Sequence, residues 1–173
     1  YLEAGIDGID IAISDESDLL LETGGGLVKA LPMIAEDPFY AINSDAIWTD
    51  GAVDALAWLA SRWDGDKMDA MLLLVPRETA HHHRGKGDFF LGDQGHLIRR
   101  GDRDSAPYVY TGVQLISKRL LRGAPDGPFS TNILWDRAIA EGVAFGLVHE
   151  GEWFDIGSPA AIAPTEAALR AYG

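Results

Sequence analysis

A short apolar segment that ends on a carboxylate, residues 39–45 (FYAINSD), constrains the fold of this chain most strongly. Its first four residues have the composition of a buried strand, and Asp45 follows at the end. The end of a buried strand lies at the rim of its sheet, and open α/β sheets bind ligands at the carboxyl rim. A second apolar run, residues 151–156, carries Asp155 near its end in the same way. The two segments predict an α/β sheet with acidic side chains at its rim.

The order of the expected elements predicts one α/β domain over residues 1–173. Strands and helices alternate in the first half and a hairpin enters later, which favours a mixed, mostly parallel sheet with helices on both faces and an antiparallel hairpin addition. The expected strands cover residues 9–14, 39–45, 70–75, 108–116, 144–149 and 151–156, and the expected hairpin covers 88–100. The expected helices cover residues 26–35, 53–63, 131–142 and 159–172.

Composition excludes several classes of function. A formal net charge of −13 disfavours a broad nucleic-acid-binding surface. No apolar run is long enough to cross a bilayer, so no membrane partner is expected. The chain has no cysteine, which excludes disulfides and thiolate metal sites and agrees with a cytoplasmic protein. A small anionic substrate stays compatible with the negative charge, because a bound cation reverses the local sign.

A glycine-rich turn, residues 22–26 (ETGGG), precedes the first expected helix. Consecutive glycines let backbone amides approach a nucleobase or phosphate, and the start of a helix adds partial positive charge. Neither the P-loop spacing nor the dinucleotide-binding fingerprint is present. A ligand-binding loop is therefore one interpretation, and a plain tight turn is the other.

Asp45 and Asp155 are the candidate metal ligands. Mg²⁺ prefers oxygen ligands and takes one or two carboxylates together with phosphate oxygens. Each aspartate also fits a turn or a helix cap, and the sequence alone does not show whether the two strands are neighbours. The histidine triplet 81–83 is more typical of an exposed loop than of a metal site, because adjacent side chains do not converge on one ion. Lys86, Arg99 and Arg100 form a small basic cluster suited either to phosphate or to a solvated hairpin face.

In this order, several sequence segments resemble those of the sugar-1-phosphate nucleotidyltransferases, the NTP-transferase family. The matching segments span nearly the whole chain: LETGGG at 21–26, NSD at 43–45, GKGDFF at 85–90, YVYTGV at 108–113, LWDRAI at 134–139 and WFDIGSP at 153–159. The resemblance implies a Rossmann-like nucleotide-diphospho-sugar transferase fold. It is strongest to bacterial members that act on N-acetylmuramate 1-phosphate in peptidoglycan recycling.

The resemblance also implies a role for individual positions. Asp45 and Asp155 match the residues that hold Mg²⁺ and act in catalysis. Thr23, Gly24 and Gly25 match the loop that holds the nucleobase. The residues that match the sugar contacts are Asn43, Gly87, Thr111 and Gly112. The implied reaction is attack of a sugar 1-phosphate on the α-phosphorus of a nucleoside triphosphate, with release of pyrophosphate. UTP and N-acetylmuramate 1-phosphate are the expected substrates, and GTP with mannose 1-phosphate is the alternative.

One part of the family pattern has no counterpart in these residues. The family opens with a strand and a glycine-rich signature loop that binds the triphosphate, so the N-terminal part of the fold is expected to be missing. A chain that starts at Tyr1 is then expected to show weak or no catalysis, and its exposed sheet edge favours pairing with another copy. A non-catalytic nucleotide-sugar-binding protein is therefore a further alternative. A metal-dependent hydrolase is disfavoured, because no water-activating base stands out.

Overall fold

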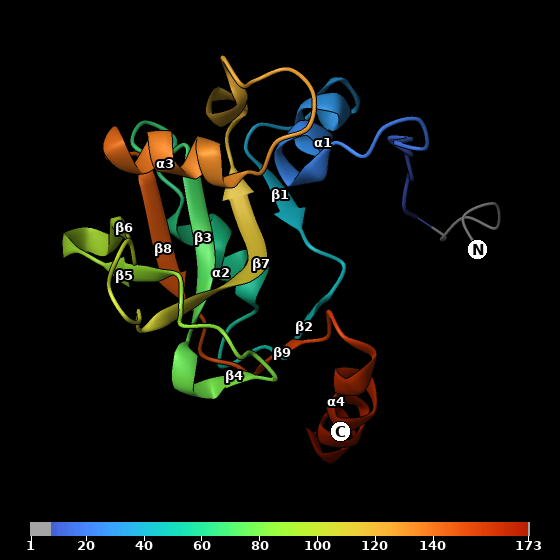
Figure 1. Cartoon of the computed structure of the whole chain (residues 1–173), viewed down its shortest axis with the longest axis vertical. Helices are drawn as coiled ribbons and strands as arrows, with labels where there is room; N and C mark the ends of the chain where they lie inside the picture. The colour runs from blue at the N-terminus through green and yellow to red at the C-terminus, as the bar shows by residue number, and fades with distance from the viewer. Residues whose placement is uncertain (1–7, 173) are drawn as a thin grey trace.

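The computed structural model describes residues 8–172, which form two sheets and four α-helices (Figure 1). A six-stranded sheet has the order β6-β5-β7-β3-β8, and β1 pairs with β7 outside this path. A smaller sheet has the order β2-β9-β4. The strands are β1 Phe39–Ile42, β2 Ala46–Trp48, β3 Ala70–Pro76, β4 Ala80–His81, β5 Phe89–Leu91, β6 Leu97–Arg99, β7 Tyr108–Ile116, β8 Ala144–Val148 and β9 Trp153–Asp155. The helices are α1 Glu22–Ala30, α2 Ala55–Arg62, α3 Asn132–Ala140 and α4 Pro159–Tyr172.

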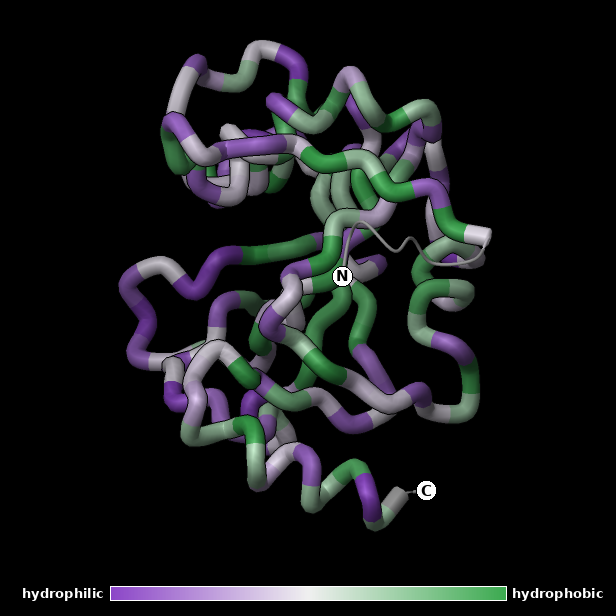
Figure 2. The backbone as a smooth tube through the Cα atoms, turned by 90° about the vertical axis from the view of Figure 1, so that its right-hand side faces the viewer, coloured by the Kyte–Doolittle hydropathy of each residue, from purple (hydrophilic) through white to green (hydrophobic). Residues whose placement is uncertain are grey.

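Strand β3 lies at the centre of the fold and separates two cores. Its side chains alternate between the two faces of the sheet. Leu72 and Leu74 pack in the larger core, which also holds residues of β1, α1 and α3. Met71 and Leu73 pack in the core beneath α2. The hydrophobic strands therefore run through the middle of the molecule (Figure 2), and the prediction of helices on both faces is confirmed.

The α/β fold class is confirmed, but the described strands form fewer parallel pairs than expected. Only β3 with β8 and β4 with β9 pair in parallel. The long strand β7 runs antiparallel to β1, β3 and β5, so it reverses the direction of the sheet at its centre. An apolar run that is buried on both faces looks the same in parallel and antiparallel sheets, so the sequence pattern did not distinguish them.

The small sheet is tied to the main sheet by Trp153 of β9. The Trp153 side chain is buried against Val75 and Val109, and its indole N–H donates a 2.9 Å hydrogen bond to the carbonyl oxygen of Thr111. Strand β9 then leads through Ser158 into α4, which extends away from the sheets (Figures 1 and 2). This anchor fixes the position of the residues that precede α4.

Two local predictions have different outcomes. The hairpin is confirmed as β5 and β6, with Asp93–Gly95 at the bend. The strand expected over residues 9–14 is wrong, because this segment forms no named strand. Its alternating Ile9, Ile11 and Ile13 side chains are all exposed, so among the described residues the pattern has no core to face. None of the helices between residues 8 and 172 is long and apolar enough to span a membrane.

Candidate functional site

Asp45 and Asp155 lie side by side, although 110 positions separate them in the sequence. Strand β1 ends at Ile42, so Asp45 lies in the turn before β2 and not at the end of the strand itself. Antiparallel pairing of β2 with β9 places Ala46 opposite Asp155. The Ile156 N–H donates a 3.0 Å hydrogen bond to the Asp45 carbonyl oxygen. The predicted convergence of the two acids is therefore present in the fold.

The two carboxylates face one small space at Gly157. A Cβ atom on Gly157 would lie 3.2 Å from Asp155 Oδ1 and 3.2 Å from Asp45 Oδ2. No cluster of three or more potential metal ligands occurs among residues 8–172. The exposed Asp45 and half-buried Asp155 carboxylates form the incomplete oxygen set that suits Mg²⁺, which keeps waters or takes substrate phosphate oxygens as its remaining ligands. The residues present therefore fit a hard divalent cation that a phosphate ligand helps to bind.

His83 lies next to this acid pair. Its Nδ1 atom is 3.8 Å from Asp155 Oδ2, and its Nε2 atom is buried without a hydrogen-bond partner among the described residues. His81 points elsewhere, with Nε2 2.5 Å from Glu152 Oε2 and its ring stacked on Phe154. His82 also lies near the Phe154 ring, with ring centroids 6.4 Å apart, so His83 is the histidine of the triplet that lies beside Asp155, and its side chain is only partly exposed. A cavity beside His82, Arg84 and Asp155 opens at the start of α4.

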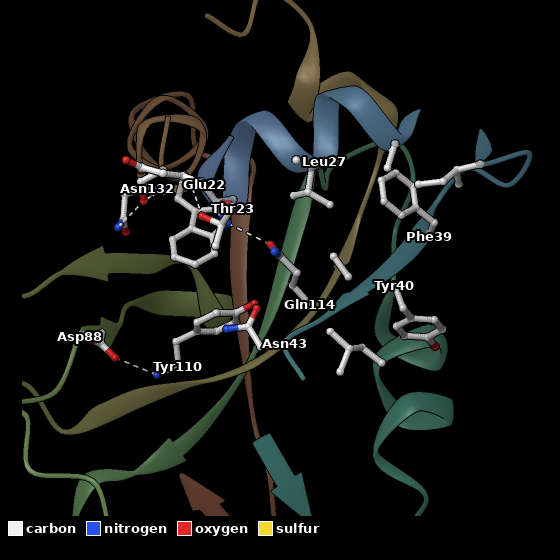
Figure 3. A pocket seen from close by; sticks show the side chains of 18 of the residues that line it. Glu22, Thr23, Leu27, Phe39, Tyr40, Asn43, Asp88, Tyr110, Gln114 and Asn132 are labelled. Atoms are coloured by element: carbon white, nitrogen blue, oxygen red, sulfur yellow. Dashed lines mark hydrogen bonds between the residues drawn. The ribbon is translucent and has the colours of Figure 1, made fainter. Parts of the chain in front are cut away.

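A larger cavity of about 600 Å³ lies beneath α1, between β1, β7 and α3 (Figure 3). Thr23 and Asn43 line it, as two of the predicted nucleotide and sugar contacts. Asn43 is two residues before Asp45, so the cavity wall continues into the turn that carries the acid. The Asn43 N–H donates a 2.8 Å hydrogen bond to the Gly112 carbonyl oxygen, which fixes this junction to β7.

Tyr110 supplies an unpaired hydroxyl to this cavity. Its ring packs edge-to-face on Trp135 with centroids 4.8 Å apart, and its N–H donates a 2.9 Å hydrogen bond to Asp88 Oδ2. The hydroxyl oxygen is buried without a partner among the described residues. Burial raises the pKa of Tyr110 above its ordinary value, so the hydroxyl stays protonated at neutral pH. Buried polar groups are rarely left unpaired, so this hydroxyl is free to hydrogen-bond a water or a polar ligand group.

The glycine segment is a helix and not a loop. Gly24 and Gly25 are buried within α1, and their N–H groups both donate to the Phe129 carbonyl oxygen, at 2.8 Å and 3.2 Å. A Cβ on Gly24 would overlap the Phe129 ring, and one on Gly25 would lie 2.5 Å from the Gly127 carbonyl oxygen. The two glycines therefore let α1 pack closely against the segment before α3. Their predicted loop conformation is wrong, and neither lines the cavity.

Thr111 and Gly112 belong to an irregularity in the sheet. The register between β3 and β7 shifts between Leu72 and Leu74, and Gly112 has a φ of +88° there. The buried Thr111 hydroxyl donates a 2.9 Å hydrogen bond to the Leu73 carbonyl oxygen and accepts one from the Val113 N–H. Its hydrogen-bonding capacity is used inside the protein, and neither residue is among those that line the cavity. The structure thus does not support the predicted sugar contact of Thr111.

Gly87 has a backbone role in the hairpin. Its φ is +79°, and a Cβ there would overlap the Ala106 carbonyl oxygen. Its own carbonyl oxygen accepts a 3.0 Å hydrogen bond from Arg100 Nε. Only Arg99 of the basic cluster lines the cavity. Arg100 instead closes the hairpin, since it also donates to the carbonyl oxygen of Arg103.

Sequence reasoning missed most of the cavity walls. They include Glu22, Asp88, Tyr110, Gln114, Asn132 and Trp135. Glu22 has a φ of +58°, a left-handed conformation that is uncommon outside glycine. Glu22, Asp88, Tyr110 and Trp135 lie within the matching segments at 21–26, 85–90, 108–113 and 134–139, which is the signal that could have found them, whereas Gln114 and Asn132 lie outside these segments. Their convergence depends on contacts between distant strands.

The chain is similar to curated proteins named N-acetylmuramate alpha-1-phosphate uridylyltransferase. It is 39% identical over 160 residues to the one from Caulobacter vibrioides, covering 92% of this chain and 66% of that protein. It is 28% identical over 152 residues to the one from Neisseria meningitidis, covering 87% of this chain and 63% of that protein. The chain thus spans slightly less than two thirds of the length of these relatives. None of the models that describe protein families matches it.

The fold also matches solved structures. HddC from Yersinia pseudotuberculosis, crystallised in complex with GMP-PN, superposes with a TM-score of 0.67 at 20% sequence identity. The match covers 88% of this chain and 64% of that one. At this identity the likeness shows a common fold.

Proposed function

Because this chain belongs to the sugar-1-phosphate nucleotidyltransferases, we propose that it acts in nucleotidyl transfer from UTP to N-acetylmuramate 1-phosphate. The products are the uridine diphosphate sugar and pyrophosphate. The names of the curated relatives support this choice of base and sugar. On this proposal the protein is a cytoplasmic enzyme of peptidoglycan recycling.

The proposal depends most on one observation, which is that the carboxylates of Asp45 and Asp155 lie close together at Gly157. Both carboxylates lie at the junction of the two sheets. Asp45 follows two residues after Asn43, which lines the larger cavity, and Asp155 lines the cavity at the start of α4. We assign Asp45 and Asp155 as the residues that hold Mg²⁺. When bound, the cation supplies charge neutralisation for the phosphate groups of the nucleotide.

The protein's own contribution to the reaction is positioning. An oxygen of the sugar phosphate attacks the α-phosphorus of UTP, and the bond from that phosphorus to the oxygen of the leaving pyrophosphate breaks. The attacking oxygen is already anionic, so no general base is needed. Holding two phosphate groups in line is the main requirement, and it removes much of the entropic cost of the encounter.

The cavity beneath α1 is assigned to the substrates. We assign Thr23, in the first turn of α1, as a nucleotide contact, and Asn43 and Tyr110, which line the same cavity, as sugar contacts. Gly24 and Gly25 contribute by bringing α1 close to the segment before α3. In the same way, Thr111 and Gly112 shape the strand that carries Tyr110.

The proposal is tested by formation of product from UTP, N-acetylmuramate 1-phosphate and Mg²⁺, followed by mass spectrometry. We expect formation of the nucleotide sugar that stops when EDTA is added. GTP with mannose 1-phosphate serves as the competing pair.

The Asp45→Asn variant is the key comparison, since it keeps the size of the side chain and removes its charge. Loss of product with this variant supports the assigned role. Equal rates for Asp45→Asn and the unmodified chain would show that the metal assignment is wrong. Faster reaction with GTP and mannose 1-phosphate would overturn the choice of substrates, and binding of the substrates without any product would favour a non-catalytic binding protein.

A further inference from the structure

The larger cavity has an unusual distribution of charge. Three carboxylates line it, those of Glu16, Glu22 and Asp88, whereas Arg99 is the only lysine or arginine among its described lining residues. Two of these carboxylates already accept hydrogen bonds from backbone N–H groups in or next to the cavity walls. Glu16 Oε2 accepts a 2.8 Å hydrogen bond from the Leu21 N–H, and Asp88 Oδ2 accepts one from the Tyr110 N–H. Arg99 is therefore the one described lysine or arginine lining this cavity that can form an ion pair with an anionic group on a ligand.

Arg99 is held rigidly at the end of β6. Its Nε donates a 2.7 Å hydrogen bond to Asp136 Oδ1, and its Nη2 donates a 3.1 Å hydrogen bond to the Asn132 carbonyl oxygen. The guanidinium also lies over the rings of Phe89 and Trp135, with Cζ 4.9 Å and 5.5 Å from the ring centroids. These contacts fix the plane of the guanidinium on the floor of the cavity, beside the aromatic residue on which Tyr110 packs.

Part of the guanidinium remains available to a ligand. Nη1 has no hydrogen-bond partner within the part of the chain that the structure describes, and a guanidinium has five N–H donors. The Arg99 side chain is 28% exposed, so it is reachable from the cavity but largely withdrawn from bulk water. A preoriented and partly desolvated arginine is well suited to bind a carboxylate.

We propose that Arg99 binds a carboxylate on the sugar and thereby selects an acidic sugar phosphate over a neutral one. This inference rests on the proposed function, because it assigns a residue to the part of N-acetylmuramate 1-phosphate that is not shared with N-acetylglucosamine 1-phosphate. The two sugars have the same ring, acetamido group and phosphate. They differ by the lactyl ether, which ends in a carboxylate. Arg99 thus acts as a specificity-determining residue and takes no part in the phosphate chemistry.

The test measures the affinity of the chain for both sugar phosphates by isothermal titration calorimetry, without nucleotide. We expect the unmodified chain to bind N-acetylmuramate 1-phosphate at least about tenfold more tightly, as a hydrogen-bonded charge pair predicts. Arg99→Gln is expected to remove this preference and to leave the affinity for N-acetylglucosamine 1-phosphate nearly unchanged.

Two control variants separate recognition from loss of a structural ion pair. Asp136→Asn breaks the same ion pair but keeps the positive charge in the cavity, so the preference should persist. Arg119→Gln breaks a matched ion pair, in which Arg119 Nε lies 2.7 Å from Asp69 Oδ1, outside this cavity. It should also leave the preference intact. Equal loss of preference in Asp136→Asn and Arg99→Gln would overturn the inference and assign Arg99 a structural role.

The remaining outcomes distinguish this inference from the proposed function. A preference that survives Arg99→Gln, an equal affinity of the unmodified chain for both sugars, or binding of neither sugar overturns the inference. If product forms from UTP in those cases, the proposed function stands. A preference that depends on Arg99 but is accompanied by no nucleotidyl transfer supports the inference and contradicts the proposed reaction.

Discussion

The indole N–H of Trp153 donates a hydrogen bond to the carbonyl oxygen of Thr111, which joins the strand that carries Asp155 to the strand that carries Tyr110. The contact links the two parts of the site. Trp153 is the residue of β9 that is buried against the main sheet, and Asp155 is the last residue of the same strand. The position of the acid therefore depends on the packing of a tryptophan two residues away.

Thr111→Val is expected to lower stability without changing sugar affinity. The substitution keeps the shape of the side chain but leaves the Leu73 carbonyl oxygen without the hydroxyl that donates to it. Loss of this buried hydrogen bond should reduce the free energy of unfolding by about 1–3 kcal/mol, as measured by urea denaturation. Thr111→Ser restores the hydroxyl and should recover part of the loss. A large fall in sugar affinity at unchanged stability would instead support the sugar contact that the family resemblance implies for Thr111.

Gly157→Ala is expected to impair metal use while the chain still folds. The added Cβ would lie 3.2 Å from both carboxylates, so one or both must move. The Mg²⁺ concentration for half-maximal activity should rise by about tenfold, because small misplacements at a reacting site are costly. Gly65→Ala is the control, since its Cβ would meet only Trp63 Nε1 at an ordinary 3.6 Å. An unchanged Mg²⁺ requirement for Gly157→Ala would argue against a shared cation.

Gly24→Ala and Gly26→Ala should have opposite effects on stability. The Gly24 Cβ would overlap the Phe129 ring, which costs about 1–3 kcal/mol in a packed interior. The Gly26 Cβ would lie 2.8 Å from Glu16 Oε1, so this carboxylate must rotate slightly while its other oxygen keeps the hydrogen bond from the Leu21 N–H. Alanine at Gly26 should gain up to about 1 kcal/mol from its higher helix propensity. Thermal unfolding of the two variants checks the prediction, and a loss of similar size in both would show that helix packing does not distinguish them.

Tyr110→Phe should weaken sugar binding and leave stability unchanged or slightly raised. The hydroxyl has no partner within the described residues, so its removal deletes no hydrogen bond and relieves an unpaired buried group. The affinity for the sugar phosphate should fall by about 2- to 10-fold, the value of one hydrogen bond. Calorimetric titration and urea denaturation of the same preparation give both quantities. A destabilised variant with normal affinity would contradict the assignment.

Much of the fold was predictable because the strongest patterns are local. The apolar run over residues 70–75 forms β3, which is one residue longer, and β7 covers the expected residues 108–116. The expected helix over 53–63 is α2, in which the Asp54 carboxylate accepts a 2.7 Å hydrogen bond from the Ala57 N–H. Caps and continuous apolar runs act within a few residues, so the sequence reveals them directly.

The rest depended on contacts that no local pattern encodes. The three consecutive glycines disfavour a helix in isolation, yet packing against Phe129 holds them in α1. The alternation over residues 9–14 is as regular as that of a strand, but it faces no core. The meeting of Asp45 with Asp155 follows from the pairing of β2 with β9, and the cavity walls come from segments that are far apart in the sequence. The family resemblance pointed to Asp45 and Asp155, which lie close together in the fold. It also assigned nucleobase binding to Gly24 and Gly25, which instead let α1 pack against the segment before α3.

Binding of Mn²⁺, measured from the electron paramagnetic resonance signal of the free ion in the presence of UTP, tests the central assignment most directly. Asp45→Asn and Asp155→Asn are each expected to remove most of the Mn²⁺ bound by the unmodified chain. The double variant is expected to lose no more than either single one, because two ligands of one ion are not independent. Full Mn²⁺ binding by either single variant, or strictly additive losses in the double variant, would contradict a cation shared by these two residues.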